Sequence, residues 1–167
     1  MTKQNAARQV HEFPPVFDSC SQILILGSFP SVKSREQHFY YGHPQNRFWK
    51  VLSSVLKEPL PNTIEEKKSM LLTHHIAIWD VIAECEIVGS SDSSIKNVVI
   101  NDFAQILNQA DIAMIYANGN TAGKIYNRYA KSVTKREITI LPSTSPANAA
   151  WTLERLTESY EQIKQYI

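Results

Sequence analysis

The sequence is short of the features that mark several large classes of protein. Its 167 residues include two cysteines and five glycines, and no apolar run approaches the roughly 18–20 residues that span a bilayer. The first dozen residues are polar and lack the apolar core of a secretory signal. Cys20 and Cys85 make neither a disulfide framework nor a metal quartet, so we expect no metal, no cofactor and a reducing cytoplasm.

A net charge of either sign is also missing. The chain carries 17 Lys and Arg against 16 Asp and Glu, which argues against a polycationic nucleic-acid coat protein. The charges are nevertheless uneven, because the stretch 112–136 has five basic residues and no acid, whereas 58–92 has seven acids and two bases. This pattern suits a polyanion that touches one face of the protein. A solvated helix face is the commoner cause of such a run, and that alternative stays open.

The chain does contain enough apolar sequence to fold. Its hydrophobic share of 43% excludes intrinsic disorder as the main state. A chain of this size buries roughly 70% of the surface that its unfolded form exposes, so a sizeable core needs no covalent staple. We expect one domain over residues 1–167, with 1–20 as an N-terminal extension, in a monomer that is not attached to a membrane.

Four short apolar runs alternate with longer amphipathic stretches. The runs are rich in isoleucine and span 23–26, 76–79, 112–117 and 138–141. None of them alternates with polar residues, which indicates strands that are covered on both faces. Apolar residues at helical spacing predict five helices, over 47–56, 63–72, 102–107, 121–130 and 147–166. Pro44 suits a first helical turn, so the first of these helices is expected to start near that residue, ahead of its apolar face. Strands that alternate with helices predict an α/β sandwich with a parallel or mixed sheet.

Turns rich in serine and proline follow the first and the last of these runs. GSFPS occupies 27–31, and PSTSP occupies 142–146. In open α/β sheets the ligand crevice lies beyond the carboxyl ends of the strands, so these turns are the first place to look for a site. Ordinary strand-to-helix turns use the same residue types, and that interpretation also stays open.

The most unusual stretch of the chain is HFYYGHPQNRFW at 38–49. Its aromatic rings offer stacking faces for a nucleic-acid base or another planar ligand. Asn46 falls in the first turn of the expected helix, where its amide can hold a water or the edge of a ligand. Phe48 and Trp49 begin the apolar face of that helix and are expected in the core. His43 either titrates in a site or is a satisfied structural residue.

These motifs, taken in order, resemble the uracil-DNA glycosylase superfamily. The blocks are GSFPS at 27–31, HPQNRFWK at 43–50, WDV at 79–81, NDF at 101–103 and LPSTSPANA at 141–149. The full pattern is closest to the hypoxanthine (deoxyinosine) DNA glycosylase branch, and HPQNRFWK is also similar to the mismatch-specific uracil/thymine glycosylases. The resemblance covers residues 23–151. It implies a three-layer α/β/α sandwich around a central, mainly parallel four-stranded sheet.

The resemblance further implies a monofunctional enzyme of base excision repair, which flips a deaminated base out of DNA and hydrolyses its N-glycosidic bond. Hypoxanthine is the expected main product, with xanthine or uracil as further substrates. Such chemistry needs a platform for the base, hydrogen bonds that read its edge, a positioned water and stabilisation of the departing base. Two alternatives stay open: a mismatch-specific uracil glycosylase, and a non-catalytic module of the same fold that binds nucleic acid or nucleotides.

The resemblance carries over to individual residues in the first half of the chain. Where the superfamily often has a water-positioning Asp or Asn, this chain has Phe29. The branch resemblance moves the catalytic role to Asn46, whose amide would orient water with its carbonyl and stabilise a polar transition state. Tyr41 matches the aromatic that stacks on the flipped base. Asp80 falls where uracil-specific relatives read the base and would accept hydrogen bonds from purine N–H groups, unless it is a cap at the strand end. Ser28 and Phe29 complete the expected base-binding set.

The late loop departs from the uracil-specific pattern at two positions. Ser143 stands where those enzymes have an electrophilic histidine, so it is the second expected catalytic residue, a donor without positive charge. Ala147 replaces their wedge leucine, and Asn148 would fill part of the gap left in the base stack. Hydroxyls and backbone N–H groups of such turns suit DNA phosphates. The residues expected to contact DNA are Ser31, Asn118, Gly119, Thr144, Ser145, Ala147 and Asn148.

Overall fold

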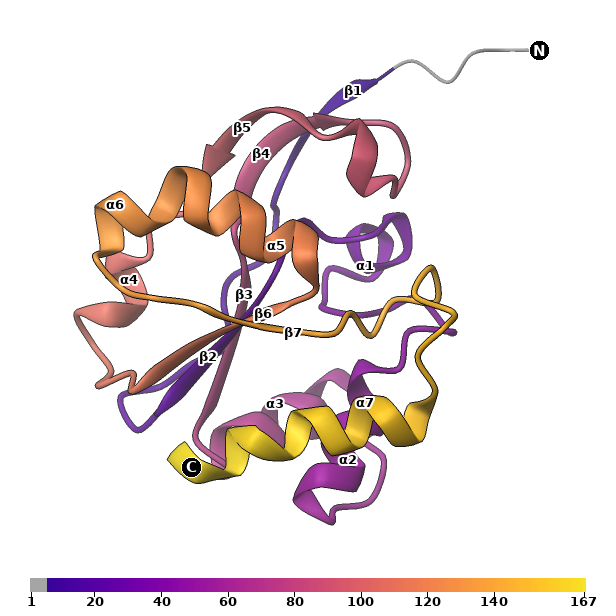
Figure 1. Ribbon diagram of the computed structural model, residues 1–167, viewed down its shortest axis with the longest axis vertical. Coiled ribbons are helices and arrows are strands. Elements are labelled where there is room, and N and C mark those ends of the chain that lie inside the picture. The colour runs from indigo at the N-terminus through magenta and orange to yellow at the C-terminus, as the bar shows by residue number, and fades with distance from the viewer. Residues whose placement is uncertain (1–5) are drawn as a thin grey trace.

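A computed structural model of the chain describes residues 6–167, with a parallel four-stranded sheet at its centre (Figure 1). Its strands are β2 (Ile23–Gly27), β3 (Ile76–Asp80), β6 (Met114–Asn118) and β7 (Thr139–Leu141), in the spatial order β3-β2-β6-β7. Every pairing between them is parallel. The four predicted strands and the predicted parallel sheet are therefore confirmed, although the third strand begins two residues later than expected.

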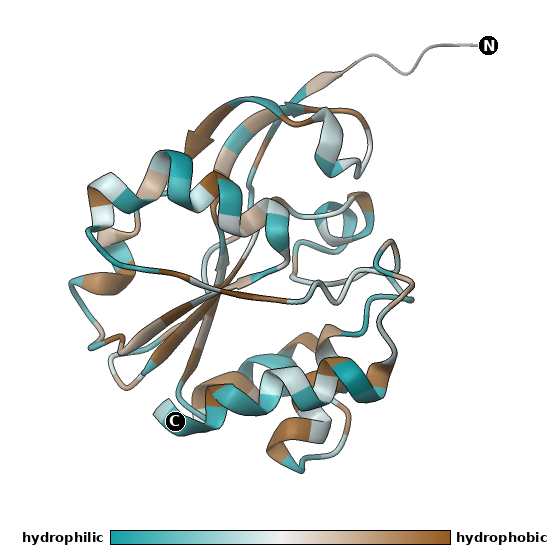
Figure 2. Cartoon of the chain, viewed as in Figure 1, coloured by the Kyte–Doolittle hydropathy of each residue, from teal (hydrophilic) through white to brown (hydrophobic). Residues whose placement is uncertain are grey.

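Helices cover both faces of this sheet and make the three layers that the family resemblance implies. On one face lie α2 (Phe48–Leu56), α3 (Ile64–Thr73) and α7 (Leu153–Tyr160); on the other lie α4 (Ala104–Leu107), α5 (Asn120–Ile125) and α6 (Lys131–Thr134) (Figure 1). Because both faces are covered, the central strand β2 is buried at every position, which explains its uninterrupted apolar run. Figure 2 shows the hydrophobic residues gathered on the strands between the two helical layers.

Two predicted helix starts are wrong, and side-chain hydrogen bonds explain both. The helix expected to start near Pro44 begins at Phe48, because Asn46 Oδ1 accepts the Phe48 N–H at 2.9 Å and closes a turn ahead of the helix. The helix expected over 147–166 begins only at Leu153. Its N-cap is Thr152, and the residues before it form a turn. Asn46 therefore lies in a turn that precedes α2 and not in the helix itself.

The other helices keep close to their expected ranges. The helix predicted over 63–72 is α3, and Thr63 and Glu66 close it with a reciprocal capping box. The helix predicted over 102–107 shortens to α4. The one predicted over 121–130 begins one residue earlier as α5, passes through a π-helical turn at Tyr126–Ala130 and continues as α6. A 3₁₀ turn at Glu161–Tyr166 follows α7, and α1 (Val32–Gln37) follows the GSFPS turn.

A second, antiparallel sheet was not expected from the sequence. It consists of β1 (Ala7–Val10), β4 (Ile82–Ile87) and β5 (Lys96–Ile100), in the order β1-β4-β5. The predicted N-terminal extension, 1–20, is part of the folded body wherever it is described, because β1 pairs with β4 and both Phe13 and Val16 are buried in the core. Residues 1–5 of that extension lie outside the described residues.

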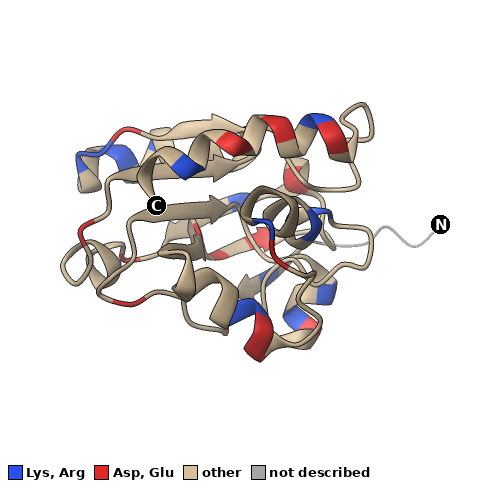
Figure 3. Ribbon diagram, turned by 90° about the horizontal axis from the view of Figure 1, so that it is seen from below, with Lys and Arg blue, Asp and Glu red and all other residues tan. Residues whose placement is uncertain are grey.

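The outer surface carries charges of both signs. In Figure 3 red and blue segments follow one another along the ribbon of α7, which contains Glu154, Arg155 and Glu158. Within residues 6–167, none of the helices combines the length and the apolarity that a bilayer crossing requires.

Candidate active site

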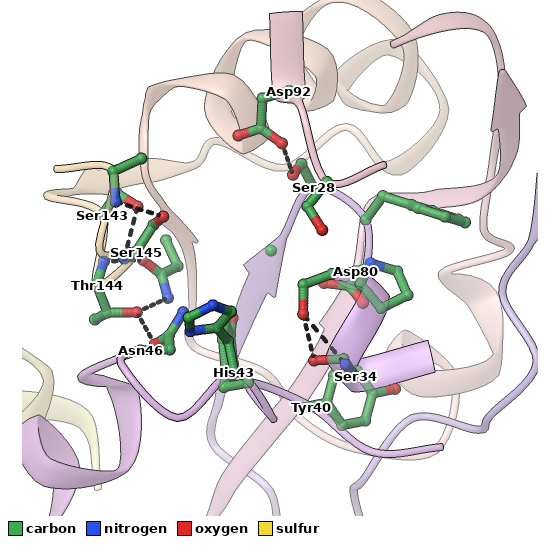
Figure 4. Close-up of a pocket in the computed structure, with 18 of the residues that line it drawn as sticks. Ser28, Ser34, Tyr40, His43, Asn46, Asp80, Asp92, Ser143, Thr144 and Ser145 are labelled. Atoms are coloured by element: carbon green, nitrogen blue, oxygen red, sulfur yellow. Dashed lines mark hydrogen bonds between the residues drawn. The ribbon is translucent and has the colours of Figure 1, made fainter. Parts of the chain in front are cut away.

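One cavity of about 300 Å³ opens at the carboxyl ends of the parallel strands (Figure 4). Both the GSFPS turn after β2 and the PSTSP turn after β7 line it, as the crevice rule for α/β sheets predicts. The expected site residues that line it are Ser28, Phe29, Ser31, Tyr41, Asn46, Asp80, Asn118, Ser143, Thr144, Ser145 and Ala147. Gly119 and Asn148 line the groove that adjoins it. The residues expected from sequence motifs thus meet around one space, although the motifs are more than one hundred residues apart.

The amide of Asn46 has a fixed orientation. Its Oδ1 accepts the Phe48 backbone N–H at 2.9 Å and the Thr144 hydroxyl at 2.8 Å. A backbone N–H only donates, so the atom facing it is the oxygen and not the nitrogen. Both lone pairs of that oxygen are occupied in this geometry, so the carbonyl is not free to orient water unless one of these bonds opens; the catalytic role of Asn46 stays a prediction. The amide nitrogen, with its two N–H groups, is the part of Asn46 available to a ligand.

A chain of hydrogen bonds behind Asn46 holds this arrangement. Asn118, the last residue of β6, donates its Nδ2–H to Thr144 Oγ1 at 2.9 Å and accepts the Thr144 backbone N–H at 3.0 Å. The Tyr160 hydroxyl lies 3.0 Å from Asn118 Oδ1. Thr144 is fully buried. Both side chains are thus engaged in hydrogen bonds that position Asn46, and contact of Asn118 and Thr144 with DNA stays a prediction.

Arg47 anchors the late loop from the opposite side. Its guanidinium donates to the backbone carbonyls of Ser145 at 2.9 Å and Asn148 at 3.1 Å, and also to that of Trp151. Its backbone N–H donates to the Thr144 carbonyl at 3.1 Å. A planar guanidinium with five N–H groups can serve several carbonyls at once. Arg47 was not expected to have a role, although it lies inside the HPQNRFWK block and that position was the available signal.

Within the late loop, Ser143 keeps a free proton. Its Oγ accepts the Ser145 N–H at 3.1 Å, so the hydroxyl hydrogen can still be donated into the cavity. Gly119 lies against it with φ +100°, and a Cβ there would lie 3.0 Å from the Ser143 Cβ. Asn148 donates its amide N–H to the Ser143 carbonyl at 3.0 Å. Asn148 is thus bound within the loop and Ala147 is exposed, and the roles of both residues toward DNA stay predictions.

The GSFPS turn and the aromatic segment form the opposite wall. Ser31 caps α1 by accepting the N–H of residue 34, and the Ser28 hydroxyl donates to Asp92 Oδ1 at 3.1 Å, so both hydroxyls are engaged within the protein. Phe29 is buried at the edge of the cavity. The Tyr41 ring stacks on the Phe48 ring, with the two centroids 3.9 Å apart. The backbone of Tyr41 is in the left-handed region, with φ +53°. Stacking of Tyr41 on a flipped base stays a prediction.

Asp80 ends β3 with its carboxylate directed to the cavity (Figure 4). Its partner is His11, at 2.8 Å between Nε2 and Oδ2, and not a helix N-terminus, so the strand-end cap is not what the structure shows. Burial, and then the nearby Asp80 charge, raise the pKa of Tyr41 well above its usual range, which keeps that phenol protonated. The Tyr41 hydroxyl lies near the Asn118 amide without the geometry of a hydrogen bond and has no partner among residues 6–167.

Asp92 and His11 are site residues that no sequence signal marked. Asp92 begins the 3₁₀ turn Asp92–Ser94 between β4 and β5, in the sheet that was not expected, and it lines the cavity beside Ser28. Part of Asp92 stays open to solvent, yet desolvation at the cavity wall raises the pKa of its carboxyl group, with the Ser28 hydrogen bond opposing the rise. The cavity therefore has two carboxyl groups, of which only Asp80 has a cationic or imidazole partner among the described residues.

His43 contributes a defined tautomer to the floor of the cavity. Its Nδ1 accepts the Gln45 backbone N–H at 3.1 Å, so a neutral His43 carries its proton on Nε2. Over the described part of the chain, His, Cys, Asp and Glu side chains form no group of three or more that could hold a metal ion. The chemistry available in the cavity is therefore hydrogen-bond donation from amide, hydroxyl and imidazole groups, and acceptance by two carboxyl groups.

Comparison with known proteins points in one direction. The model of the "Uracil DNA glycosylase superfamily" matches residues 14–166. A hypoxanthine DNA glycosylase of Methanosarcina acetivorans is 37% identical over 87% of this chain and 92% of its own length, and one of Methanosarcina barkeri is 36% identical over 81% and 86%. An NMR structure from Methanosarcina acetivorans, described as that of a candidate uracil DNA glycosylase, superposes with a TM-score of 0.78 at 32% identity over 97% of this chain and 96% of that one.

Proposed function

The chain belongs to the uracil DNA glycosylase superfamily, and we propose that it is a monofunctional DNA glycosylase, a cytoplasmic monomer that releases hypoxanthine from deoxyinosine in DNA. The observation that carries this proposal is the pairing of a donor with an acceptor across one cavity: the free amide nitrogen of Asn46 and the carboxylate of Asp80. The names of the two archaeal relatives support the same substrate. The product, an abasic site, would pass to the later steps of base excision repair.

The donor and acceptor suit the edge of a deaminated purine. Hypoxanthine presents an N1–H donor beside a C6 carbonyl, whereas adenine presents a lone pair at N1 beside an amine. A carboxylate at Asp80 accepts the N1–H of hypoxanthine and repels the lone pair of adenine. A site built to accept an N–H discriminates strongly against an analogue that lacks it, because the buried acceptor is then left unpaired. Xanthine and uracil also carry a lactam N–H, which is why they are further candidate substrates.

Bond cleavage needs help mainly on the departing base. As the C1′–N9 bond breaks, its electron pair leaves with the base, and a water adds to the sugar at C1′. The Asn46 amide N–H groups and the Ser143 hydroxyl are donors that can stabilise the negative charge on the base. Because the cavity-lining residues include no lysine, the proposed reaction is hydrolysis and not an amine-linked cleavage of the strand.

Water needs an acceptor, and Asp92 is the free one. The Asn46 oxygen is occupied by two donors and Asp80 is assigned to the N–H of the base, whereas Asp92 lines the cavity and accepts a hydrogen bond from Ser28. We assign the role of holding the attacking water to Asp92, in place of the acid that Phe29 displaces from the first turn. The ability of the Asp92 carboxylate to accept a proton from this water then depends on pH.

This role predicts an acid limb in the pH–rate profile. Below the raised pKa of Asp92 the carboxyl is protonated and cannot accept a proton from water, so the rate falls as pH falls through that pKa. Asp92→Asn should flatten this limb and lower single-turnover excision of deoxyinosine by about 10²-fold, the lower end for one general base. The exposed acid Asp111 provides the control Asp111→Asn. An acid limb that survives unchanged in Asp92→Asn would contradict this role.

The proposed function is tested by a panel of substrates. Duplexes with deoxyinosine, deoxyxanthosine or deoxyuridine are incubated with excess protein, and abasic sites are revealed by alkaline cleavage. We expect the fastest cleavage at deoxyinosine. Cleavage confined to uracil in mismatches would favour the mismatch-specific alternative, which the same donor and acceptor could serve. No cleavage of any duplex, with DNA binding intact, would favour the non-catalytic module.

A further inference from the structure

A buried imidazole–carboxylate pair lies directly behind the cavity. His11 Nε2 and Asp80 Oδ2 are 2.8 Å apart, and the two side chains are only 2% and 5% exposed. His11 follows β1, and its backbone N–H donates to the Ala83 carbonyl in β4 at 2.7 Å, three residues after Asp80. Two ionisable groups this deeply buried need a reason, because burial of a charge is costly unless it is paired.

The imidazole has few other contacts that could explain it. Its ring packs against Phe13 at 4.4 Å between centroids, against Tyr40 at 5.9 Å and edge-on against Phe29 at 6.2 Å. Through Nε2, Asp80 is the partner of His11 within residues 6–167. The three aromatic rings thus surround the imidazole and hold Nε2 against Oδ2 of Asp80.

Docking of the N-terminal segment does not require this pair. The β1–β4 ladder holds residues 7–10, and Val16 exchanges backbone hydrogen bonds of 3.0 Å with Ile78 in both directions. The Tyr40 hydroxyl donates to the Pro14 carbonyl at 2.8 Å. The segment is thus anchored on both sides of His11 by contacts of its own, and the pair is left to serve Asp80.

The two oxygens of Asp80 have different surroundings as a result. Oδ2 is bound to His11, whereas Oδ1 lies against Gly27, where any Cβ would collide with it. A Cβ on Gly27 would also lie 3.2 Å from the hydroxyl of Tyr41, which is buried and unpartnered among the described residues. Oδ1 has no hydrogen-bond partner of its own in the described part of the chain, and Asp80 lines the cavity. The free oxygen Oδ1 of Asp80 therefore lies against the end of β2, close to the unpartnered hydroxyl of Tyr41.

We propose that His11 is a positioning residue for base recognition: by holding Oδ2 it fixes the Asp80 carboxylate and leaves Oδ1 to accept the lactam N–H of the extruded base. This inference rests on the proposed function. Without His11, the buried Oδ2 is left without a hydrogen-bond partner, and the carboxyl group is no longer held with Oδ1 toward the base. Discrimination for a base with an N–H should then be lost, while catalysis by Asn46 remains.

The test compares two bases that differ at the lactam. Deoxyinosine carries the N1–H, and deoxynebularine, an unsubstituted purine, carries a lone pair at N1. In the wild-type protein single-turnover release should favour hypoxanthine over purine. His11→Phe, which keeps an aromatic ring, should lower this ratio by about tenfold or more, whereas His11→Gln, which keeps an N–H donor, should restore most of it. His11→Gln with a loss as great as that of His11→Phe would contradict the proposal.

A matched control and a double variant separate positioning from stability. Arg8→Met breaks an exposed ion pair to Glu84 between the same two strands, away from the cavity, and should leave the ratio unchanged. In an Asp80→Asn background the buried charge is absent, so adding His11→Phe should fold and should change the ratio no further. A further tenfold change there, or an unchanged ratio in folded His11→Phe, would overturn the proposal. A wild-type protein that releases nothing from deoxyinosine would instead overturn the proposed function.

Discussion

Asn46→Ala is expected to lower single-turnover release of hypoxanthine by about 10²–10³-fold, the loss typical of one preorganised donor at a developing anion. The amide nitrogen is the free half of this side chain, because Phe48 N–H and Thr144 Oγ1–H already occupy its oxygen. Folding should survive, since α2 still packs through its buried apolar face. The measurement is the excision rate on a deoxyinosine duplex, with the thermal midpoint recorded for each variant.

Asn46→Asp separates a donor role from an acceptor role. The carboxylate has nearly the same shape and can still accept from Phe48 and Thr144, but it has no N–H to offer. If Asn46 acts as a donor, Asn46→Asp should be as slow as Asn46→Ala at neutral pH. Thr144→Val, which removes one of the two bonds that orient the amide, should cost less, about tenfold. Activity of Asn46→Asp close to that of the wild type would show that the side chain orients water through oxygen, and the assignment would be wrong.

Arg47→Met should have the second largest effect, on stability and activity together. The guanidinium donates to the carbonyls of Ser145, Asn148 and Trp151. Leaving several partly buried carbonyls unpaired should lower the free energy of unfolding by about 2–4 kcal/mol. The same loop carries Ser143 and the Thr144 hydroxyl that orients Asn46. The excision rate should therefore fall at least about 100-fold, as much as when one preorganised donor is removed.

The neighbouring Arg155 provides a matched control. It is exposed, donates to the Ala150 carbonyl and lies 4.2 Å from the Trp151 ring centroid, so Arg155→Met touches the same loop from its solvent side. We expect it to change the free energy of unfolding by less than about 1 kcal/mol, as exposed charge contacts usually do. Urea unfolding and single-turnover excision measure both variants. Equal stability losses in Arg47→Met and Arg155→Met would contradict the anchoring role of Arg47.

Much of the fold could be predicted because its signals are local. The four strands of the parallel sheet are short apolar runs, which can be recognised without knowing their partners. β2 and β3 are buried at every position, as expected, whereas Ile140 in β7 is exposed. The two serine- and proline-rich turns mark the carboxyl ends of β2 and β7, where the cavity lies. The second sheet gave no such signal, because β5 is half exposed and β1 is short and polar.

The functional detail depends on contacts between distant residues. The free nitrogen of Asn46 follows from Thr144, which lies 98 positions away, and the free oxygen of Asp80 follows from His11, which lies 69 positions away. Asp92 reaches the cavity only because the turn between β4 and β5 bonds to Ser28. Residue types in the motifs predict which side chains gather, but not which atom of each side chain is left free. That information lies in the hydrogen bonds.

The most direct measurement of the account is the balance of products from one deoxyinosine duplex. Under single turnover the wild-type protein should release free hypoxanthine, detected by mass spectrometry, in equal amount to abasic sites, with the strand intact until alkali is added. Asn46→Ala should leave hypoxanthine in the DNA over the same period. Strand cleavage without alkali would contradict a monofunctional hydrolysis. Absence of free hypoxanthine from the folded, DNA-bound wild-type protein would contradict the central claim.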